Sequence, residues 1–520
     1  MAPFRLTRPR AALAQDDATQ GPSQSQGQTV GQPAQPLSPP VREPGLLSSY
    51  DALGHYCELL GLSGDVSAPT QAILERINRM DDATLRARAR DAELELYNFG
   101  ITFTVYTQKD VIDRILPFDV IPRVIAPADW DRLERGVKQR VTAINHFLWD
   151  IYHDQKILND GVVPRDLVLS NVNYRPEMQG MDVPHGTYAH IDGTDLVRGG
   201  DGEFYVLEDN ARTPSGVSYV VENRHLMLRT FPDLMDELPV RPVSNYGQKL
   251  REALGEIAPQ GVDEPVVVLL SPGTYNSAYF EHIFLAREMG VPLVEGRDLV
   301  VEDDRVYMKT IRGPQRVDVI YRRINDDFLD PEAFNPDSML GVAGLMRAYA
   351  KGNVGLANAV GTGVADDKAI YAYMPRIIEY YLGESAILAN VETHICREKE
   401  GLQYTLDHLD ELVVKPVGEA GGYGITVGPR ASKEELELCR QQLLDRPENY
   451  ISQPMVDLSV SPTLVEEGIE PRHVDLRPFA VTGKDTWVLP GGLTRVALRR
   501  GSIIVNSSQG GGSKDTWVLE

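Results

Sequence analysis

The clearest pattern in this chain is ELVVKPVGEAGGYGITVG, residues 411–428. An apolar run ends at Lys415, and a second β-favouring run begins at Ile425. Between them stand Gly418, Gly421, Gly422 and Gly424. Glycine lets a backbone approach a ligand closely, and consecutive N–H groups in such a loop hold anions. The stretch therefore predicts a strand, a phosphate-holding loop and a second strand, with the Lys415 ammonium beside the loop.

Other interpretations of this loop remain open. It lacks the GxxxxGK[ST] spacing of a Walker A motif. It also differs from the glycine-rich turn of a dinucleotide-binding fold, because that turn leads into a helix and this loop is flanked by strands. A plain glycine-rich hairpin with a solvated lysine has the same pattern. Further residues are therefore needed to identify a nucleotide site.

A second stretch, residues 190–216, reads HIDGTDLVRGGDGEFYVLEDNARTPSG. Glu208 and Asn210 stand two apart at the end of a β-favouring run, so their side chains point to the same side. Paired oxygen ligands suit Mg²⁺, which usually takes one or two carboxylates together with substrate phosphates. Asp192, on an earlier strand, is the expected third oxygen ligand. The alternative interpretation is an acidic strand end that leads into a turn.

Two more cations belong to the candidate site. Lys368 lies in the first turn of a helix predicted for residues 366–383, where the helix dipole disfavours a positive charge. Arg495 lies in LPGGLTRVALRRG, which predicts a strand, and a strand arginine with one buried face is often a fixed anion ligand. A surface arginine is the equal alternative. Phosphate-neutralising cations, a glycine-rich loop and an oxygen-ligand cluster are together the parts of a nucleotide-dependent transfer site.

The composition excludes several other classes of protein. The chain has 520 residues and a formal net charge of −23. Such an acidic chain is a poor partner for nucleic acid or anionic lipid, both of which attract Lys and Arg. Its three cysteines lie far apart in the sequence, which excludes a disulfide framework or a CxxC site, and no apolar run reaches the length of a membrane helix. We expect a cytoplasmic protein without nucleic-acid or membrane partners.

The pattern along the chain predicts three parts. Residues 1–45 are rich in Gln, Ser and Pro, and such a segment buries too little apolar surface to fold, so we expect a disordered tail. Residues 46–116 are expected to form an N-terminal helical segment. Residues 117–520 carry the candidate chemistry, with an α/β lobe around 262–330 and a nucleotide lobe around 362–500.

Local patterns predict several elements inside these parts. Apolar residues at helical spacing predict helices at 128–152 and 432–444, besides the one at 366–383. VVVLL at 266–270, followed by a Gly-containing loop and an amphipathic run, predicts a buried strand, a loop and a helix. The string KDTWVL occurs at 484–489 and again at 514–519, which predicts two similar strands in one sheet.

Together these stretches resemble the circularly permuted ATP-grasp family and, more distantly, the synthetase domain of glutathionylspermidine synthase. The resemblance begins near residue 117 and is carried by FYVLEDNARTPSGVSYVVENR, VDVIYRRINDDFLDP, GNVGLANAVGTGVADDKAIYAYMPRIIEYYLGE, VVKPVGEAGGYG, YISQPMVDLS and LPGGLTRVA. It implies a multi-lobed α+β or α/β fold with mixed sheets and flanking helices. In ordinary ATP-grasp chains the nucleotide lysines precede the metal carboxylates. Here Glu208 precedes Lys368 and Lys415, as a permuted order requires.

The resemblance also implies roles for individual residues. Lys415 and Arg495 are the expected catalytic residues, and Gln453 is expected near the adenine. The full implied set is Asp192, Glu208 and Asn210 for Mg²⁺, and Lys368, Lys415, Gly418, Gly421, Gly422, Gly424, Gln453 and Arg495 for ATP. The family pattern has an arginine two residues before the metal aspartate. Here His190 stands in that place, so its role is open.

The implied reaction is an ATP- and Mg²⁺-dependent joining of a carboxylate to an amine through an acyl-phosphate. Small molecules and peptides both qualify as the acid and the amine. Arg175, Arg322 and Arg323 are candidates to bind a substrate carboxylate, although a structural ion pair is the slightly favoured interpretation of each. Two alternatives remain: a kinase that releases a phosphorylated product, and an ATP-binding protein that acts through a protein partner.

Overall fold

The computed structural model describes residues 45–61, 68–106, 111–236, 238–418, 424–503, 505 and 511–520. Residues 45–520 cluster as one compact unit. The predicted tail at 1–45 lies outside the described residues except for Gly45, and so do Gly421 and Gly422. The division of the chain at residues 45 and 116 stays a prediction.

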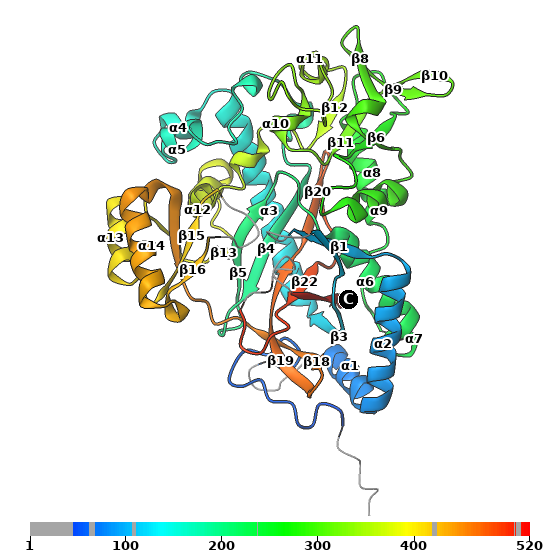
Figure 1. The fold of residues 1–520 in the computed structure, drawn as a ribbon, viewed down its shortest axis with the longest axis vertical. Helices are drawn as coiled ribbons and strands as arrows, with labels where there is room; N and C mark the ends of the chain where they lie inside the picture. The colour runs from blue at the N-terminus through cyan, green and yellow to red at the C-terminus, as the bar shows by residue number, and fades with distance from the viewer. Residues whose placement is uncertain are drawn as a thin grey trace, which may run out of the picture. The chain divides into compact units, whose positions relative to one another are not determined.

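A mixed ten-stranded sheet forms the centre of this unit (Figure 1). Its main path runs β13-β5-β4-β19-β22-β23-β3. Off this path, β18 pairs with β19, β20 pairs with β4, and β21 pairs with β20. The strands are β3 (Phe118–Ile125), β4 (Ile191–Arg198), β5 (Phe204–Asn210), β13 (Ala389–Asn390), β18 (Val460–Val465), β19 (Gly468–Arg477), β20 (Phe479–Thr482), β21 (Thr486–Val488), β22 (Leu493–Val496) and β23 (Gly512–Val518). The two KDTWVL copies fall on β21 and β23, so the prediction of two strands in one sheet is confirmed.

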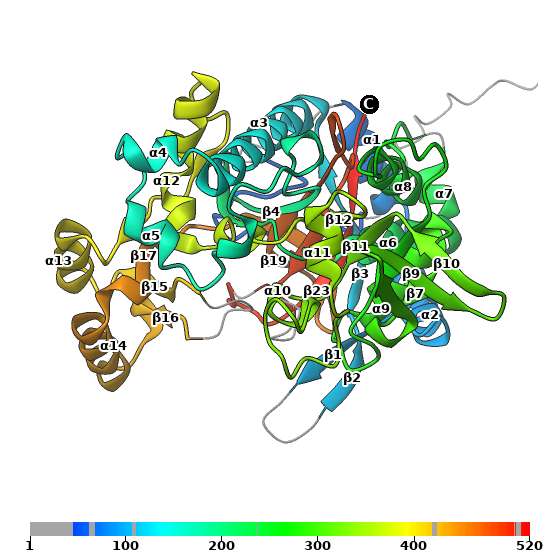
Figure 2. The ribbon, with the colours of Figure 1, turned by 90° about the horizontal axis from the view of Figure 1, so that it is seen from above.

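Helices cover both faces of this sheet (Figure 2). On one face α3 (Pro127–Tyr152) packs Trp130, Val137 and Val141 against strand residues such as Leu196 and Val206. The helix predicted at 128–152 is thus confirmed, and it begins at a proline, whose missing N–H costs nothing in the first turn. On the other face lie α6 (Val217–Thr230), α7 (Pro232–Met235) and α8 (Tyr246–Glu256).

The pairing of β4 with β5 contains an irregularity that determines the site. Near the turn the strands pair regularly, with Arg198 opposite Phe204 and Leu196 opposite Val206. The register then shifts, so that Asp195 pairs with Glu208 and Gly193 with Asn210. Leu207 is the extra residue on β5, and a one-residue bulge turns every later side chain to the opposite face.

A smaller parallel sheet, β12-β11-β6-β7, forms the α/β lobe. Its strands are β6 (Val267–Leu270), β7 (Leu293–Val294), β11 (Val319–Arg322) and β12 (Gly355–Ala357), and α9 (Tyr279–Met289) connects β6 to β7. The strand, loop and helix predicted from residue 266 onward are confirmed. A three-stranded antiparallel sheet follows in β8 (Leu299–Glu302), β9 (Arg305–Thr310) and β10 (Gly313–Val317).

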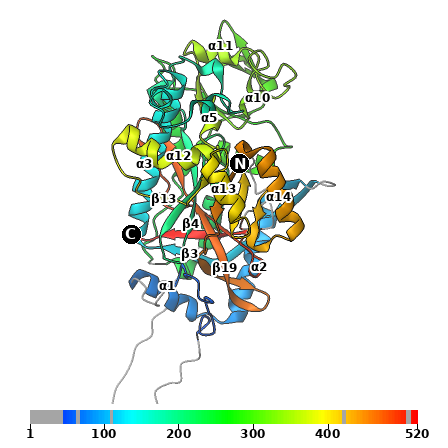
Figure 3. The ribbon, with the colours of Figure 1, turned by 90° about the vertical axis from the view of Figure 1, so that its left-hand side faces the viewer.

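The part of the chain predicted as the nucleotide lobe contains an antiparallel sheet ordered β14-β17-β15-β16. Its strands are β14 (His394–Ile395), β15 (Leu412–Pro416), β16 (Thr426–Val427) and β17 (Tyr450–Pro454). Helices α13 (Lys399–Asp407) and α14 (Lys433–Asp445) share a small core with it. Figure 3 views the molecule from the side on which these two helices lie. Helix α12 (Lys368–Leu382) contacts both this sheet and the central one. The predicted helices at 366–383 and 432–444 are confirmed to within two residues.

The N-terminal segment is only partly helical. Helices α1 (Ala68–Asn78) and α2 (Asp82–Asn98) are followed by an antiparallel hairpin of β1 (Thr102–Tyr106) and β2 (Val111–Ile115). The expectation of a helical segment through residue 116 is therefore too broad. TFTVY and VIDRI are rich in β-branched residues, which favour strands. Shorter helices are α4 (Lys156–Asn159), α5 (Arg165–Leu169), α10 (Asp326–Leu329) and α11 (Leu345–Ala350).

Candidate functional site

Lys415 lies near the end of β15 and faces groups from four other segments. Its Nζ donates to Gln453 Oε1 on the neighbouring strand β17 at 2.6 Å, and Gln453 Nε2 donates to Thr393 Oγ1 at 2.9 Å. The pKa of Lys415 is lowered to about 8, mainly by burial and also by the charge of nearby Lys368. The charges of Glu208 and Asp195 act in the opposite direction and only partly offset this decrease. A cation that is this poorly solvated suits a site for a polyanion.

Lys368 begins α12, and the residue before it builds that helix end. Asp367 caps α12 by accepting hydrogen bonds from the N–H groups of Ala369 at 2.8 Å and Ile370 at 3.3 Å. Lys368 Nζ lies 3.6 Å from Glu208 Oε2 at the end of β5. Lys368, Lys415 and Glu208, which are far apart in the sequence, are thus brought together.

We call the side of the β4–β5 hairpin that carries Asp195, Glu208 and Asn210 the open face. The side chain of Glu208 is 29% exposed. Asn210 Nδ2 donates to Gly193 O at 3.1 Å, which leaves its amide oxygen as the atom that can bind a cation. Two carboxylates and an amide oxygen on one face fit the oxygen-ligand preference of Mg²⁺. In the part of the chain that the structure describes, no three His, Cys, Asp or Glu side chains form a ready metal cluster, so such a site would rest on this mixed set.

Asp192 is not part of this group. With Thr194 and Asp209 it lies on the other side of the hairpin, which we call the closed face. Asp192 is fully buried, its Oδ1 accepts a hydrogen bond from Thr194 Oγ1 at 2.8 Å, and burial beside Asp209 raises its pKa well above the usual value. The bulge at Leu207 separates it from Glu208 and Asn210. We therefore replace Asp192 with Asp195 in the expected metal set.

Arg495 lies beside the open face, together with an arginine that the sequence analysis missed. Arg495 Nη2 donates to Asp195 Oδ2 at 2.6 Å, and its Nε donates to both oxygens of Asp475 on β19. Arg477, two residues further along β19, also pairs with Asp195. Burial alone raises the pKa of Asp195, but the two arginines outweigh it and hold that pKa well below its usual range. The two-residue spacing of Asp475 and Arg477 was the available signal.

The three candidate substrate arginines are all engaged inside the protein. Arg322 is 1% exposed and donates to three main-chain oxygens besides pairing with Asp326 at 2.7 Å. Arg323 donates to Pro214 O at 2.6 Å and pairs with Glu281 at 3.1 Å. Arg175 pairs with Asp327 at 2.7 Å. These contacts favour the structural interpretation of all three residues.

His190 is also an internal residue. It is 2% exposed, and its Nδ1 lies 3.0 Å from Thr482 O. Burial lowers its pKa to about 4, so its ring is neutral near pH 7. With Asp195 in the metal set, the position two residues before the metal aspartate is Gly193, so His190 no longer stands in the place of the family's arginine.

The glycine-rich loop is described only at its two ends. Gly418 is exposed and follows β15. Gly424 has φ of +71° and precedes β16, and at this angle a side chain would strain the backbone. Because Gly421 and Gly422 lie outside the described residues, the predicted contact of this loop with phosphate stays a prediction.

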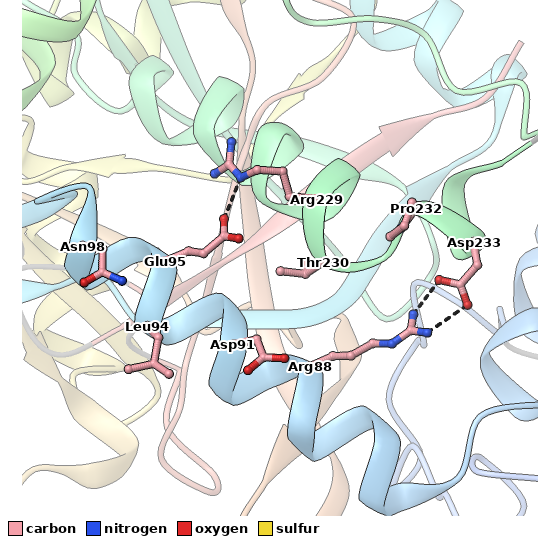
Figure 4. A pocket seen from close by; sticks show the side chains of 9 residues that line it. All are labelled: Arg88, Asp91, Leu94, Glu95, Asn98, Arg229, Thr230, Pro232 and Asp233. Atoms are coloured by element: carbon pink, nitrogen blue, oxygen red, sulfur yellow. Dashed lines mark hydrogen bonds and ion pairs between the residues drawn. The ribbon is translucent and has the colours of Figure 1, made fainter. Parts of the chain in front are cut away.

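A separate hollow of about 590 Å³ lies between α2 and the α6–α7 turn (Figure 4). Its arginines are paired: Arg88 Nη1 with Asp233 Oδ1 at 2.6 Å, and Arg229 Nε with Glu95 Oε2 at 2.6 Å. None of the residues that line it belongs to the candidate site. We also find no helix, among those described, that is long and apolar enough to span a membrane.

The fold is that of an ATP-grasp protein. The sequence profile of the family described as circularly permuted ATP-grasp type 2 matches residues 122–497. The chain belongs to this family, which confirms the family and fold that the sequence motifs indicated. A solved glutathione synthetase-like effector of Globodera pallida, in its apo form, has the same overall fold, with a TM-score of 0.56 over 85% of this chain and 98% of that one at 12% identity.

Relatives in bacteria extend the similarity. A Synechocystis protein named only as uncharacterised is 53% identical over 475 residues, which are 91% of this chain and 99% of the relative. A similarly named Mycobacterium tuberculosis protein is 50% identical over 485 residues, 92% of this chain and 87% of its own length. A Frankia alni protein, provisionally named as a glutamate–cysteine ligase, is 42% identical over 95% of this chain. This match spans only 57% of the Frankia chain.

Proposed function

We propose that this protein is an ATP-dependent carboxylate–amine ligase that works through an acyl-phosphate and needs Mg²⁺. One observation carries the proposal: Lys415, Lys368 and Glu208 converge from three segments of the chain, with Lys368 Nζ 3.6 Å from Glu208. This is the arrangement needed to hold a metal-bound triphosphate, because cations and a metal carboxylate then act on the same phosphates. Family membership supports ATP as the nucleotide.

Each group in the site has a proposed task. Lys368 and Lys415 neutralise the phosphates, and the loop from Gly418 through Gly421 and Gly422 to Gly424 covers them. Asp195, Glu208 and Asn210 hold Mg²⁺, which offsets negative charge on the phosphoryl oxygens. Gln453 lies at the nucleotide, and Arg495 with Arg477 faces the phosphate that is transferred. A cation held by two carboxylates, as Arg495 is, keeps a fixed position for that task.

The proposed reaction has two balanced steps. A substrate carboxylate oxygen attacks the γ-phosphorus of ATP, the bond to the β-phosphate oxygen breaks, and ADP leaves. The amine nitrogen then attacks the acyl carbon, its proton is lost to solvent, and the C–O bond to phosphate breaks to release phosphate and amide. The described side chains provide charge and orientation and no covalent nucleophile, which fits three buried cysteines whose thiols are not exposed.

We infer that the acid and the amine are amino acids or short peptides. The support is the provisional name of the Frankia relative, whose ligase would join two amino acids. Three free, buried cysteines fit a reducing compartment, and we propose the cytoplasm as the place of action. Thiol titration of protein taken rapidly from cells tests this: oxidised cysteines would contradict a cytoplasmic location.

Thermal unfolding with ATP, with and without Mg²⁺, tests the nucleotide site. A ligand at one hundred times its dissociation constant stabilises a protein by about 2.7 kcal/mol. We expect a Mg²⁺-dependent shift in the wild type that Lys415→Ala loses. Lys249→Ala, which removes an exposed lysine of α8, is the matched control and should respond like the wild type. No shift in the wild type at millimolar ATP would contradict the proposal.

Product analysis then separates a ligase from a kinase. Pairs of amino acids or short peptides are incubated with ATP and Mg²⁺, and ADP, free phosphate and amide are measured. A ligase gives the three in equal amounts, and only when acid and amine are both present. ADP with a stable phosphorylated compound and no amide would identify a kinase instead.

A further inference from the structure

One buried side chain forms hydrogen bonds to both strands that carry the proposed metal ligands. Asn358 follows directly after β12 and is 2% exposed. Its Oδ1 accepts from the N–H groups of His190 and Ile191, both at 2.8 Å. Its Nδ2 donates to Ile191 O at 2.7 Å, to Ala211 O at 2.6 Å and to Arg212 O at 3.3 Å. The whole amide is therefore used on main-chain atoms at the ends of β4 and β5.

These contacts stand where the next rung of the β4–β5 ladder would form. The last pair is Gly193 with Asn210, and the two chains separate beyond it. Paired residues of an antiparallel ladder exchange N–H···O bonds, and Ile191 makes both of its bonds with the Asn358 amide instead of with a residue of β5. The side chain thus sets how far the strands separate just beyond Asn210.

A carboxylate holds the same part of β5 through the opposite kind of atom. Asp366 Oδ1 accepts from Ala211 N at 2.6 Å and from Arg212 N at 3.1 Å. Residues 211 and 212 therefore give their carbonyl oxygens to Asn358 and their N–H groups to Asp366. The peptide group between Ala211 and Arg212 is therefore held on both sides, by Asn358 through its oxygen and by Asp366 through its N–H.

Each of these two residues is tied to a different part of the fold. Arg322, on β11 of the α/β lobe, donates its Nε to the main-chain oxygen of Asn358 at 2.6 Å. Asp366 stands two residues before Lys368, in the segment that leads into α12. The end of β5 is thus held from the α/β lobe and from the helix that carries a nucleotide lysine.

We propose that Asn358 and Asp366 are positioning residues that fix the end of β5, so that the oxygens of Glu208 and Asn210 are set for Mg²⁺. This inference rests on the proposed function, because it assumes that the open face holds Mg²⁺ with ATP. Groups that orient metal ligands commonly change metal affinity roughly 10- to 100-fold when they are removed. The two residues touch no reacting atom. They act through the main chain of residues 211 and 212, and Asp366 also pairs with the Arg212 side chain at 3.5 Å.

The test measures the Mg²⁺ concentration that gives half of the ATP-dependent thermal stabilisation. We compare Asn358→Ser with Asn145→Ser, because Asn145 is also a buried asparagine bonded to main-chain groups, those of Tyr188 and Ala189. Asp366→Ala is compared with Asp150→Ala, because Asp150 likewise accepts from two consecutive N–H groups, those of Lys156 and Ile157. Asn145 holds residues 188 and 189, ahead of β4, and Asp150 holds the start of α4, whereas the two proposed positioning residues bond to residues 211 and 212 after β5.

We expect the half-saturating Mg²⁺ concentration to rise at least about tenfold in Asn358→Ser and Asp366→Ala. In both controls it should stay within about twofold of the wild-type value. The inference is overturned if Asn358→Ser and Asp366→Ala lower the melting temperature without raising the Mg²⁺ requirement. It is also overturned if neither variant folds while both controls fold, because the two residues then serve stability alone. A wild type without any Mg²⁺ response overturns the proposed function as well. A normal wild-type response with unchanged requirements in the variants overturns only the positioning role.

Discussion

The two faces of the β4–β5 hairpin both carry acidic side chains, but Asp209 and Glu208 differ in their burial and in their ion pairs. On the closed face Asp209 forms a two-pronged ion pair with Arg140 of α3, at 2.6 and 2.7 Å, and both side chains are almost fully buried. On the open face Glu208 is partly exposed, and the nearest cation, Lys368, lies 3.6 Å away. Adjacent residues of one strand thus differ in whether their charge is already satisfied inside the protein.

The difference teaches that two adjacent acids of one strand, Asp209 and Glu208, are paired with cations to different extents inside the fold. Burial alone lowers the pKa of Arg140, but Asp209 outweighs it and the net pKa lies above its usual value. Lys415, beside the open face, has no buried bidentate carboxylate, and burial lowers its pKa to about 8. The Asp209–Arg140 pair is therefore complete without a ligand, whereas Glu208 and Lys415 gain from a bound cation and polyanion.

The largest expected effect is on the closed face. Asp209→Ala leaves Arg140 buried without its carboxylate, and we expect a loss of about 3–5 kcal/mol in the free energy of unfolding. Urea unfolding measures it. Replacing both partners, Asp209→Leu with Arg140→Met, should recover most of this loss, because no uncompensated charge remains. If Asp209→Ala has the same free energy of unfolding as the wild type, this ion pair does not distinguish the two faces.

A smaller effect, in activity and not in stability, is expected on the open face. Glu208→Gln keeps the shape of the side chain and removes its charge, and we expect ATP turnover to fall about a hundredfold, as for other single contacts to developing charge. The free energy of unfolding should change little. Glu203→Gln, at the other end of the same hairpin, is the control and should turn over normally. Equal activity in the two variants would remove Glu208 from the site.

The pH dependence of ATP binding gives a still smaller effect. Below about pH 8 Lys415 is charged, and above it the free protein must take up a proton to bind phosphate in the same way. The dissociation constant for ATP should therefore rise as pH increases from 7 to 9, by at most about tenfold per pH unit above 8. Calorimetry at several pH values measures it. Lys415→Arg should remove this rise, since arginine stays charged, and an unchanged rise would show that another group titrates.

The smallest effect is expected at Asp192. Its folded pKa is raised, so its contribution to stability is complete below the unfolded value of about 3.9 and is lost as pH increases toward the folded value. Asp192→Asn mimics the protonated form. The melting temperature of this variant, relative to that of the wild type, should increase as pH rises above about 4. Its Mg²⁺ requirement should stay within about twofold of wild type. A large rise in that requirement would return Asp192 to the metal set.

Much of the fold follows from local pattern. The spacing of Val137, Val141 and Ile144 predicts α3, because a helix with one fully buried stripe repeats its apolar residues every three or four positions. The hairpin of β1 and β2 was missed because residues 46–116 were interpreted as one segment, although the Thr- and Val-rich run at 102–106 has strand character. Local composition was the available signal there.

The site could be predicted only where the two-residue alternation of side chains along a strand determines which face a residue occupies. The two-residue spacing of Glu208 and Asn210 places them on one face. A regular hairpin would also have put Asp192 opposite Asn210, and only the extra residue Leu207 moves Asp195 into that face. A bulge leaves no sequence signal of its own in this stretch. Asn358 was missed for another reason, because its partners at 190–191 and 211–212 are brought to it only by the tertiary fold.

The pairing of β23 with β3 has a consequence for how the protein is made. Strand β3, at residues 118–125, is covered on one edge only when residues 512–518 pair with it in parallel. A ribosome that adds about 5–20 residues per second takes roughly 20–80 s to travel from one strand to the other. During that time the emerging chain carries an unpaired strand edge that other chains can reach. Cells that make this protein must therefore shield a half-built sheet throughout the synthesis of its ATP-grasp domain.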